Sequence, residues 1–108
     1  MFVRSALRDL RAFPASARRK AGHELFRVQQ GGHPVDWRPM SIIGRGVHEI
    51  RIHAEGEWRV IYLVSLPEAV YVLHAFGKKS RRTNPLDIAV ARARLRLARE
   101  GAARGEGR

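Results

Sequence analysis

The residues of this sequence best suited to chemistry are basic side chains placed within three short runs of strand-forming residues. The runs are GVHEIRI, WRVIYLV and AVYVLHAFGKK. A charged side chain in a strand otherwise rich in Val, Ile, Leu and Tyr must lie on a wet face or at a site. A small sheet with cations on one face offers a surface for a phosphodiester. The candidate catalytic residues are Arg51, Arg59, His74, Lys78 and Lys79.

These residues also have structural interpretations. Arg51 could form a cross-strand ion pair with Glu55 or Glu57. His74 could be a core histidine with a satisfied hydrogen bond. The third run continues into four cations, which are Lys78, Lys79, Arg81 and Arg82. They could form a solvated turn before a helix, but we favour anion binding, because like charges repel unless an anion joins them.

Alternation along each strand predicts which side chains share a face. In the first run, one face carries His48, Ile50 and Ile52, and the other carries Val47, Glu49, Arg51 and His53. We expect the apolar face to meet the helices and the other face to be open to solvent or substrate. In the second run, one face carries Arg59, Ile61 and Leu63, and in the third run one face carries Val70, Val72, His74 and Phe76.

The formal net charge is +11, and the excess lies at the two ends of the chain. Residues 1–30 hold seven Arg or Lys against two acids, residues 31–77 four against five, and residues 78–108 ten against three. This distribution favours a polyanionic partner, of which nucleic acid is the commonest, although Arg-rich helices can also be merely solvated faces. The sequence has no cysteine and no apolar run long enough to span a membrane. We therefore expect a soluble, cytoplasmic protein with no membrane partner.

The hydrophobic periodicity predicts a single α+β domain over residues 1–100, in the order α-α-β-β-β-α. Two N-terminal helices are expected at 5–13 and 14–30, and a C-terminal helix begins at Asn84-Pro85. The three runs form a twisted antiparallel sheet of three to four strands, with a short extended segment possible near 40–43. Residues 101–108 are expected to be a disordered basic tail.

Three sets of apolar residues are expected to be buried. The stripe of the second helix is Ala17, Ala21, Leu25 and Val28, and that of the last helix is Ile88, Ala91, Leu95 and Ala98. In the connector that precedes the sheet, the inward-facing residues are Trp37, Met40, Ile42 and Ile43.

No cofactor or metal site is predicted. Gly44 and Gly46 lack the strand–loop–helix context that a nucleotide-binding fingerprint needs. His48 and His53 fall on opposite faces of one strand, so they do not converge on a metal ion.

Several motifs, taken together in this order and spacing, resemble the phage-derived HigB branch of the RelE/ParE toxin superfamily over about residues 3–100. They are Trp37-Arg38-Pro39, the Glu-Ile-Arg of residues 49–51, the Trp-Arg-Val-Ile-Tyr of residues 58–62, the His-Ala-Phe-x-Lys-Lys of residues 74–79, and Thr83-Asn84-Pro85. Each motif alone is weak. The superfamily contains several variants of the catalytic set, and this chain has no tyrosine after its lysine pair, which leaves the general acid and base open.

The resemblance implies the toxin of a type II toxin–antitoxin pair. RelE-like members cut messenger RNA in the ribosomal A site with basic residues in place of a metal. The 2′-hydroxyl attacks the adjacent phosphate, which gives a cyclic phosphate and a free 5′-hydroxyl. The implied partners are messenger RNA on the ribosome and a helix-turn-helix antitoxin, with no small-molecule cofactor.

The resemblance also implies roles for individual residues. Arg59 matches the arginine that contacts the scissile phosphate. Arg51 and Lys79 would stabilise charge, and Lys78 or His74 would transfer protons. The residues expected to bind RNA around them are Arg45, His53, Arg81 and Arg82.

Two other functions stay open. A ParE-like toxin of the same fold would inhibit gyrase and cut nothing, but such chains generally lack the Arg and Lys cluster on the sheet. A non-catalytic basic module would bind RNA or the ribosome, and its affinity would fall with added salt for every RNA sequence.

Overall fold

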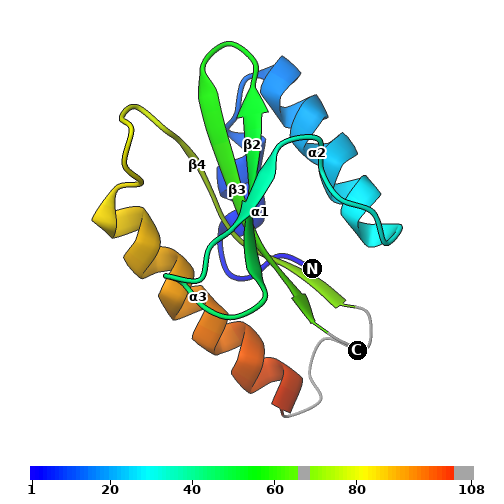
Figure 1. The fold of residues 1–108 in the computed structure, drawn as a ribbon, viewed down its shortest axis with the longest axis vertical. Coiled ribbons are helices and arrows are strands. Elements are labelled where there is room, and N and C mark those ends of the chain that lie inside the picture. The colour runs from blue at the N-terminus through cyan, green and yellow to red at the C-terminus, as the bar shows by residue number, and fades with distance from the viewer. Residues whose placement is uncertain (66–68, 104–108) are drawn as a thin grey trace.

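The computed structural model describes residues 1–65 and 69–103, which form three helices around one antiparallel sheet (Figure 1). The predicted α+β class is confirmed. The turn expected at 66–68 and residues 104–108 of the expected tail lie outside the described residues. The elements are α1 (Ala6–Arg11), α2 (Ala15–Gln29), β1 (Trp37–Pro39), β2 (Val47–His53), β3 (Glu57–Ser65), β4 (Ala69–Gly77) and α3 (Pro85–Ala103).

The sheet has the order β1-β2-β3-β4, with every neighbouring pair antiparallel. The fourth strand is β1, at 37–39, so the extended segment predicted near 40–43 is wrong. There the backbone turns instead, because the N–H groups of Ile43 and Gly44 both donate to the Met40 carbonyl, at 2.9 and 3.2 Å. Pro39, which has no N–H to donate, ends this short edge strand.

Helices cover both faces of the sheet, which corrects the expectation that one face is open. The first core lies between the sheet and α1 and α2, and it contains the predicted α2 stripe. The second lies between the sheet and α3, where Ala91, Leu95 and Ala98 are buried as predicted and Ile88 is partly buried. In Figure 1, α2 and α3 lie on opposite sides of the strands. Helix α3 therefore covers part of the face that carries Glu49 and Arg51.

A bulge in β4 changes the predicted faces of that strand. Tyr62 pairs with Val72, but the preceding residue Ile61 pairs with His74, so Leu73 is an extra residue. As a result Val70 and Val72 face α1 and α2, whereas Phe76 and His74 lie on the α3 side. The prediction that all four share one face is wrong.

The connector between α2 and β2 buries only part of its predicted set. Met40 and Ile43 are buried, and Trp37 is half-buried and stacked on His33. Ile42 was expected to pack inward, but its side chain is 56% exposed. The turn at 40–43 points it away from the core.

The helix ends follow the sequence signals closely. Gly31, with φ +89°, follows α2. The Asn84 side-chain oxygen accepts a hydrogen bond from the Leu86 N–H at 2.8 Å at the start of α3. Helix α3 continues to Ala103, so residues 101–103 are helical and do not belong to a tail. No helix in the described ranges is long and apolar enough to cross a membrane.

The close approach of the connector to α3 generates a prediction. A Cβ atom at Gly44 would overlap with Cδ2 of Leu95, a buried core side chain. We expect Gly44→Ala to lower the free energy of unfolding by about 1–3 kcal/mol, because the core must shift to admit the methyl group. Urea denaturation measures the change.

The control is Gly22→Ala, at a helical position where a Cβ would meet nothing within 4 Å. It should raise the free energy of unfolding by about 0.5–1 kcal/mol, because alanine loses less backbone entropy on folding. If both variants shift stability in the same direction, the packing of the connector against α3 is not as described.

Candidate functional site

At the centre of the sheet, on the α3 side, one buried carboxylate lies among three arginines. Glu49 has no exposed surface. Its Oε1 atom is 3.0 Å from Nε of Arg38, 3.5 Å from Nε of Arg51 and 3.7 Å from Nε of Arg59. We call Arg38, Glu49, Arg51 and Arg59 the charged cluster.

Strand register assembles the charged cluster. In the pairing of β1 with β2, Arg38 is opposite Glu49, and in that of β2 with β3, Arg51 is opposite Arg59. Glu49 and Arg51 are two residues apart on one strand, so they share a face. Two guanidinium groups directly opposite each other repel, and the shared carboxylate offsets that repulsion.

The arginines all face Glu49 through Nε, which leaves the outer ends of the guanidinium groups for other partners. Within the described residues, the Nη atoms of Arg38 and Arg51 make no hydrogen bond. Nη1 of Arg59 donates to Glu57 Oε1 at 3.2 Å and to the Trp58 carbonyl at 3.0 Å. Arg38 and Arg51 are 41% and 32% exposed, so their free ends reach solvent, whereas Arg59 is nearly buried. Such ends match the oxygens of a phosphate.

Not every polar atom of the charged cluster has a hydrogen bond. Oε2 of Glu49 and the Nε atoms of Arg51 and Arg59 are buried and have no hydrogen-bond partner within the described part of the chain. At 3.5 and 3.7 Å their contacts with Oε1 are ion pairs without hydrogen-bond geometry. Arg51 and Arg59 are thus held at Glu49 by charge, whereas Arg38 donates a hydrogen bond to it.

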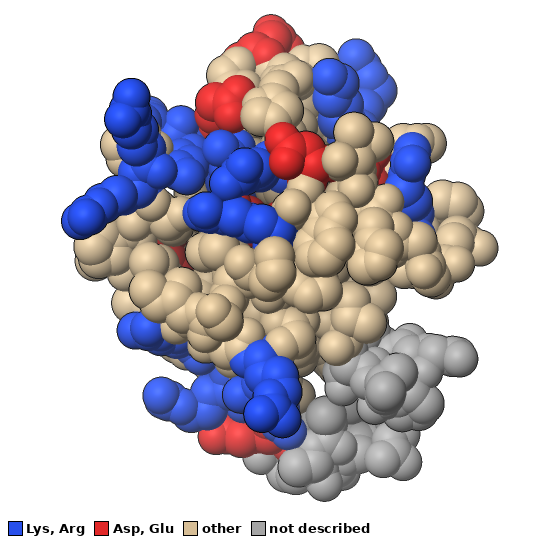
Figure 2. Space-filling model, viewed as in Figure 1, with Lys and Arg blue, Asp and Glu red and all other residues tan. Residues whose placement is uncertain are grey.

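Lys78 adjoins the charged cluster at the end of β4, where its N–H donates to the Glu57 carbonyl at 2.8 Å. Its pKa is lowered from the ordinary lysine value, chiefly by desolvation. Glu49 opposes that shift, and the positive charges of the three arginines add to it. Counting Arg38, Arg51, Arg59 and Lys78 against Glu49 and Glu57 leaves a charge of 4 − 2 = +2. Figure 2 shows Lys and Arg side chains gathered over the β4–α3 connection and the neighbouring sheet, at the upper left.

His74, a predicted catalytic residue, belongs to a different network. Its Nε2 is 2.7 Å from Asp87 Oδ1, and its Nδ1 is 3.8 Å from Asp9 Oδ2. Nη1 of Arg94 donates to Asp9 Oδ2 at 3.2 Å and lies 3.5 Å from His74 Nδ1. The ring is buried and stacked on Phe76. This network ties α1, β4 and α3 together, and Ile61 separates His74 from Glu49 across the sheet.

His53 lies beside the charged cluster and is held by two carboxylates. Its Nε2 is 2.7 Å from Asp36 Oδ2, and its Nδ1 is 2.7 Å from Glu57 Oε2. The hydrogen bond with Asp36, and then that with Glu57, raises the pKa of the imidazole. The hydrogen bond with His53 lowers the pKa of Glu57, desolvation opposes that shift, and the hydrogen bond with Arg59 adds to it. His53 is thus paired with acids and does not present a free charge.

The other predicted RNA-binding residues are placed in two regions. Arg81 and Arg82 are exposed on the β4–α3 connection and, with Arg38, line a groove. Lys79 is exposed beside them. Arg45 precedes the first residue of β2, whereas Arg51 lies near the end of that strand, about 20 Å away along the chain. The Arg45 carbonyl accepts a hydrogen bond from Arg99 at 3.2 Å. Arg45 is therefore not part of the charged cluster.

The structure thus brings Arg51, Arg59 and Lys78 together, and it adds two residues that the sequence analysis gave no role. Arg38 lay in a motif used only for the resemblance, and Glu49 was taken as an acid on an open face. A carboxylate that alternates with an arginine inside an apolar strand is the signal that could have identified Glu49. Arg38 gives no such signal, because only the β1–β2 register places it opposite Glu49.

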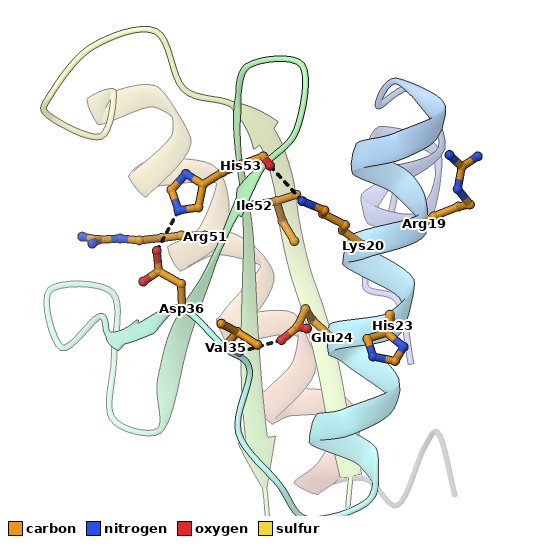
Figure 3. A pocket seen from close by; sticks show the side chains of 9 residues that line it. All are labelled: Arg19, Lys20, His23, Glu24, Val35, Asp36, Arg51, Ile52 and His53. Carbon is orange, nitrogen blue, oxygen red and sulfur yellow. Dashed lines mark hydrogen bonds and ion pairs between the residues drawn. The ribbon is translucent and has the colours of Figure 1, made fainter.

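A second hollow lies on the other side of β2, between that strand and α2 (Figure 3). Nζ of Lys20 donates to the His53 carbonyl at 3.1 Å, and Glu24 Oε2 accepts a hydrogen bond from the Val35 N–H at 2.7 Å. Three Arg or Lys and two acidic side chains line it, which leaves a formal charge of 3 − 2 = +1. Within the described residues, no group of three or more His, Cys, Asp or Glu side chains could hold a metal ion.

The chain also matches a known family. Residues 8–96 match the family model described as phage derived protein Gp49-like (DUF891). No match is found among curated proteins. The matched range contains the whole sheet, the charged cluster and most of α3. The chain therefore belongs to the phage-derived Gp49-like family.

Proposed function

We propose that this protein is the toxin of a type II toxin–antitoxin pair, an endoribonuclease that cuts messenger RNA on the ribosome. The observation that carries the proposal is the convergence of three guanidinium groups on Glu49, with the Lys78 backbone hydrogen-bonded to Glu57 next to them. Membership of the Gp49-like family and the resemblance to HigB and RelE toxins support it. An antitoxin of the helix-turn-helix class would be the second partner.

The charged cluster suits transfer of a phosphoryl group between two oxygens of RNA. The 2′-oxygen forms a bond to phosphorus, the bond from phosphorus to the 5′-oxygen breaks, and the products are a 2′,3′-cyclic phosphate and a 5′-hydroxyl. Negative charge grows on the non-bridging oxygens in between. The Nη ends of Arg38 and Arg51, together with Arg59, would stabilise that charge without a change of position.

We assign proton transfer to Lys78 in preference to His74. The lowered pKa of Lys78 makes its neutral amine more available to accept the proton of the 2′-hydroxyl. His74 is held by Asp87 and lies beyond Ile61, so its proposed role is to position α3. The 5′-oxygen takes up a proton from water as it leaves, and Lys78 returns the proton of the 2′-hydroxyl to the solvent.

Arg59→Ala tests the enzyme. We expect it to lower the rate of message cleavage on purified ribosomes by about 100-fold or more, as loss of one preorganised charge does in other enzymes. It should also relieve the growth arrest that follows expression of the wild-type chain. Cleavage is read by primer extension, and growth is scored at matched protein levels.

The matched control is Arg96→Ala, which removes the same charge from an exposed position on α3. It should cleave within about twofold of wild type. We expect a neighbouring gene to encode a small helix-turn-helix protein, and co-expression of that protein should also relieve the growth arrest. If the chain arrests growth without cutting messenger RNA, and Arg59→Ala arrests growth as strongly as wild type, the results would favour a gyrase inhibitor. Equal loss of ribosome binding in both variants would favour a non-catalytic module.

Glu49→Gln tests the electrostatic role of the buried carboxylate. The variant keeps the shape of the side chain but leaves three guanidinium groups without their shared partner. We expect the free energy of unfolding to fall by about 2–3 kcal/mol, less than for a fully buried pair because Arg38 and Arg51 reach solvent. Sulfate should raise the melting temperature of the variant more than that of wild type, since an anion can replace the lost charge.

Sodium chloride at the same ionic strength controls for screening. Glu100→Gln, at an exposed position of α3, controls for the loss of one acid. If sulfate stabilises Glu49→Gln no more than Glu100→Gln, the arginines do not form an anion site.

The pKa of Lys78 supplies a further check. Because Glu49 raises this pKa and the arginines lower it, Glu49→Gln should move the pKa of Lys78 further below that of wild type. Titration of the Lys78 Cε resonance by NMR measures both values. A pKa that stays unchanged or rises would show that Lys78 does not share the field of the charged cluster.

A further inference from the structure

A groove runs along the edge of the charged cluster, between the connector and the start of α3. It has a volume of about 580 Å³. Its apolar floor and one wall are formed by Pro39, Met40, Ile42, Pro85 and Ile88. Arg38, Arg81 and Arg82 also line it, and among the described residues that line it there is no Asp or Glu. We call this the connector groove.

The exposed wall of the connector groove is held in place. Ile42 is 56% exposed, yet its carbonyl accepts two hydrogen bonds from Arg92 of α3, at 3.0 Å from Nε and 2.6 Å from Nη2. A bidentate contact of this kind fixes the backbone and so the direction of the side chain. An apolar side chain held out towards solvent costs free energy unless a ligand covers it.

Thr83 also lines the groove. Its Oγ1 atom is buried and has no hydrogen-bond partner among the described residues. A ligand could supply the missing hydrogen bond only if the side chain turned towards the groove. The hollow between α2 and β2 differs, because Glu24 and Asp36 offset two of its three Arg and Lys charges.

The lining selects a ligand that is apolar on one side and anionic on the other. A nucleotide of single-stranded RNA has both properties, since its base can lie on an apolar surface while its phosphate meets arginines. Arg38 belongs both to the groove and to the charged cluster, so an RNA strand can pass from one to the other without leaving cationic surface.

We propose that the connector groove binds the nucleotide that adjoins the scissile linkage, with its base against Ile42 and Ile88 and its phosphate against Arg81 and Arg82. The proposal rests on the proposed endoribonuclease function and adds a substrate subsite to it. Single-stranded RNA fits because a paired base would have its edge and one face covered.

The test is an NMR titration of the whole chain with an RNA trinucleotide whose 2′-oxygens are methylated, which prevents cleavage. We expect the amide shifts to concentrate at Ser41, Ile42 and Thr83, and not at Asp36. Ile42→Glu places a carboxylate at an already exposed position, and it should raise the dissociation constant at least about fivefold, as loss of one base contact does.

Val35→Glu is the matched control, because Val35 is 80% exposed and the same charge is added away from the groove. It should change the dissociation constant less than about twofold. Equal weakening in both variants, shifts outside the groove, no binding of the trinucleotide, or binding of an acidic peptide in its place would overturn the groove assignment. If the trinucleotide binds as expected but wild type cuts no message on ribosomes, the nuclease proposal fails and the groove stands as an RNA site.

Discussion

The Glu49 carboxylate, with no exposed surface, lies within 3.7 Å of three guanidinium groups, and the arrangement of the sheet depends on this contact. Without it, Arg51 and Arg59 would face each other across two strands, and only the pair of Arg59 with Glu57 would remain to offset their repulsion. A buried charge is costly unless it is paired, so arginine and carboxylate each make the burial of the other possible. Because the contacts with Glu49 run through Nε, the Nη atoms of Arg38 and Arg51 are left for the anion binding that we propose.

The two cores hold that contact in place from opposite sides. The first core packs α1 and α2 against Ile50, Val60 and neighbouring residues, and the second packs α3 against Val47 and Ile61. The bulge at Leu73 then allows His74 to reach the start of α3, where it meets Asp87. A histidine within a run of strand residues thus helps to place the helix that borders the connector groove.

The excess of positive charge around the charged cluster lies within the part of the chain that matches the Gp49-like family. The family match covers the sheet and most of α3. The charge surplus remains after Glu49 and Glu57 are counted, and it continues through Arg38 into a groove lined by arginines. A single-stranded nucleic acid matches such a surface, because its phosphates can contact the cations and its unpaired bases can contact the apolar side chains.

What is local in sequence was predictable from sequence. The buried stripes of α2 and α3, the Asn84 cap and the three long strands follow from the 3.6- and 2-residue periods and from turn chemistry, and the same period placed Arg59 with Ile61 and Leu63. Only the tertiary structure decided the rest. The strand register places Arg38 opposite Glu49, and a bulge moves His74 to the other face of the sheet. Helix α3 covers part of a face that was expected to be open. Pairing between distant strands is set by the packing of the whole sheet, and one inserted residue reverses every later face, so no local pattern contains that information.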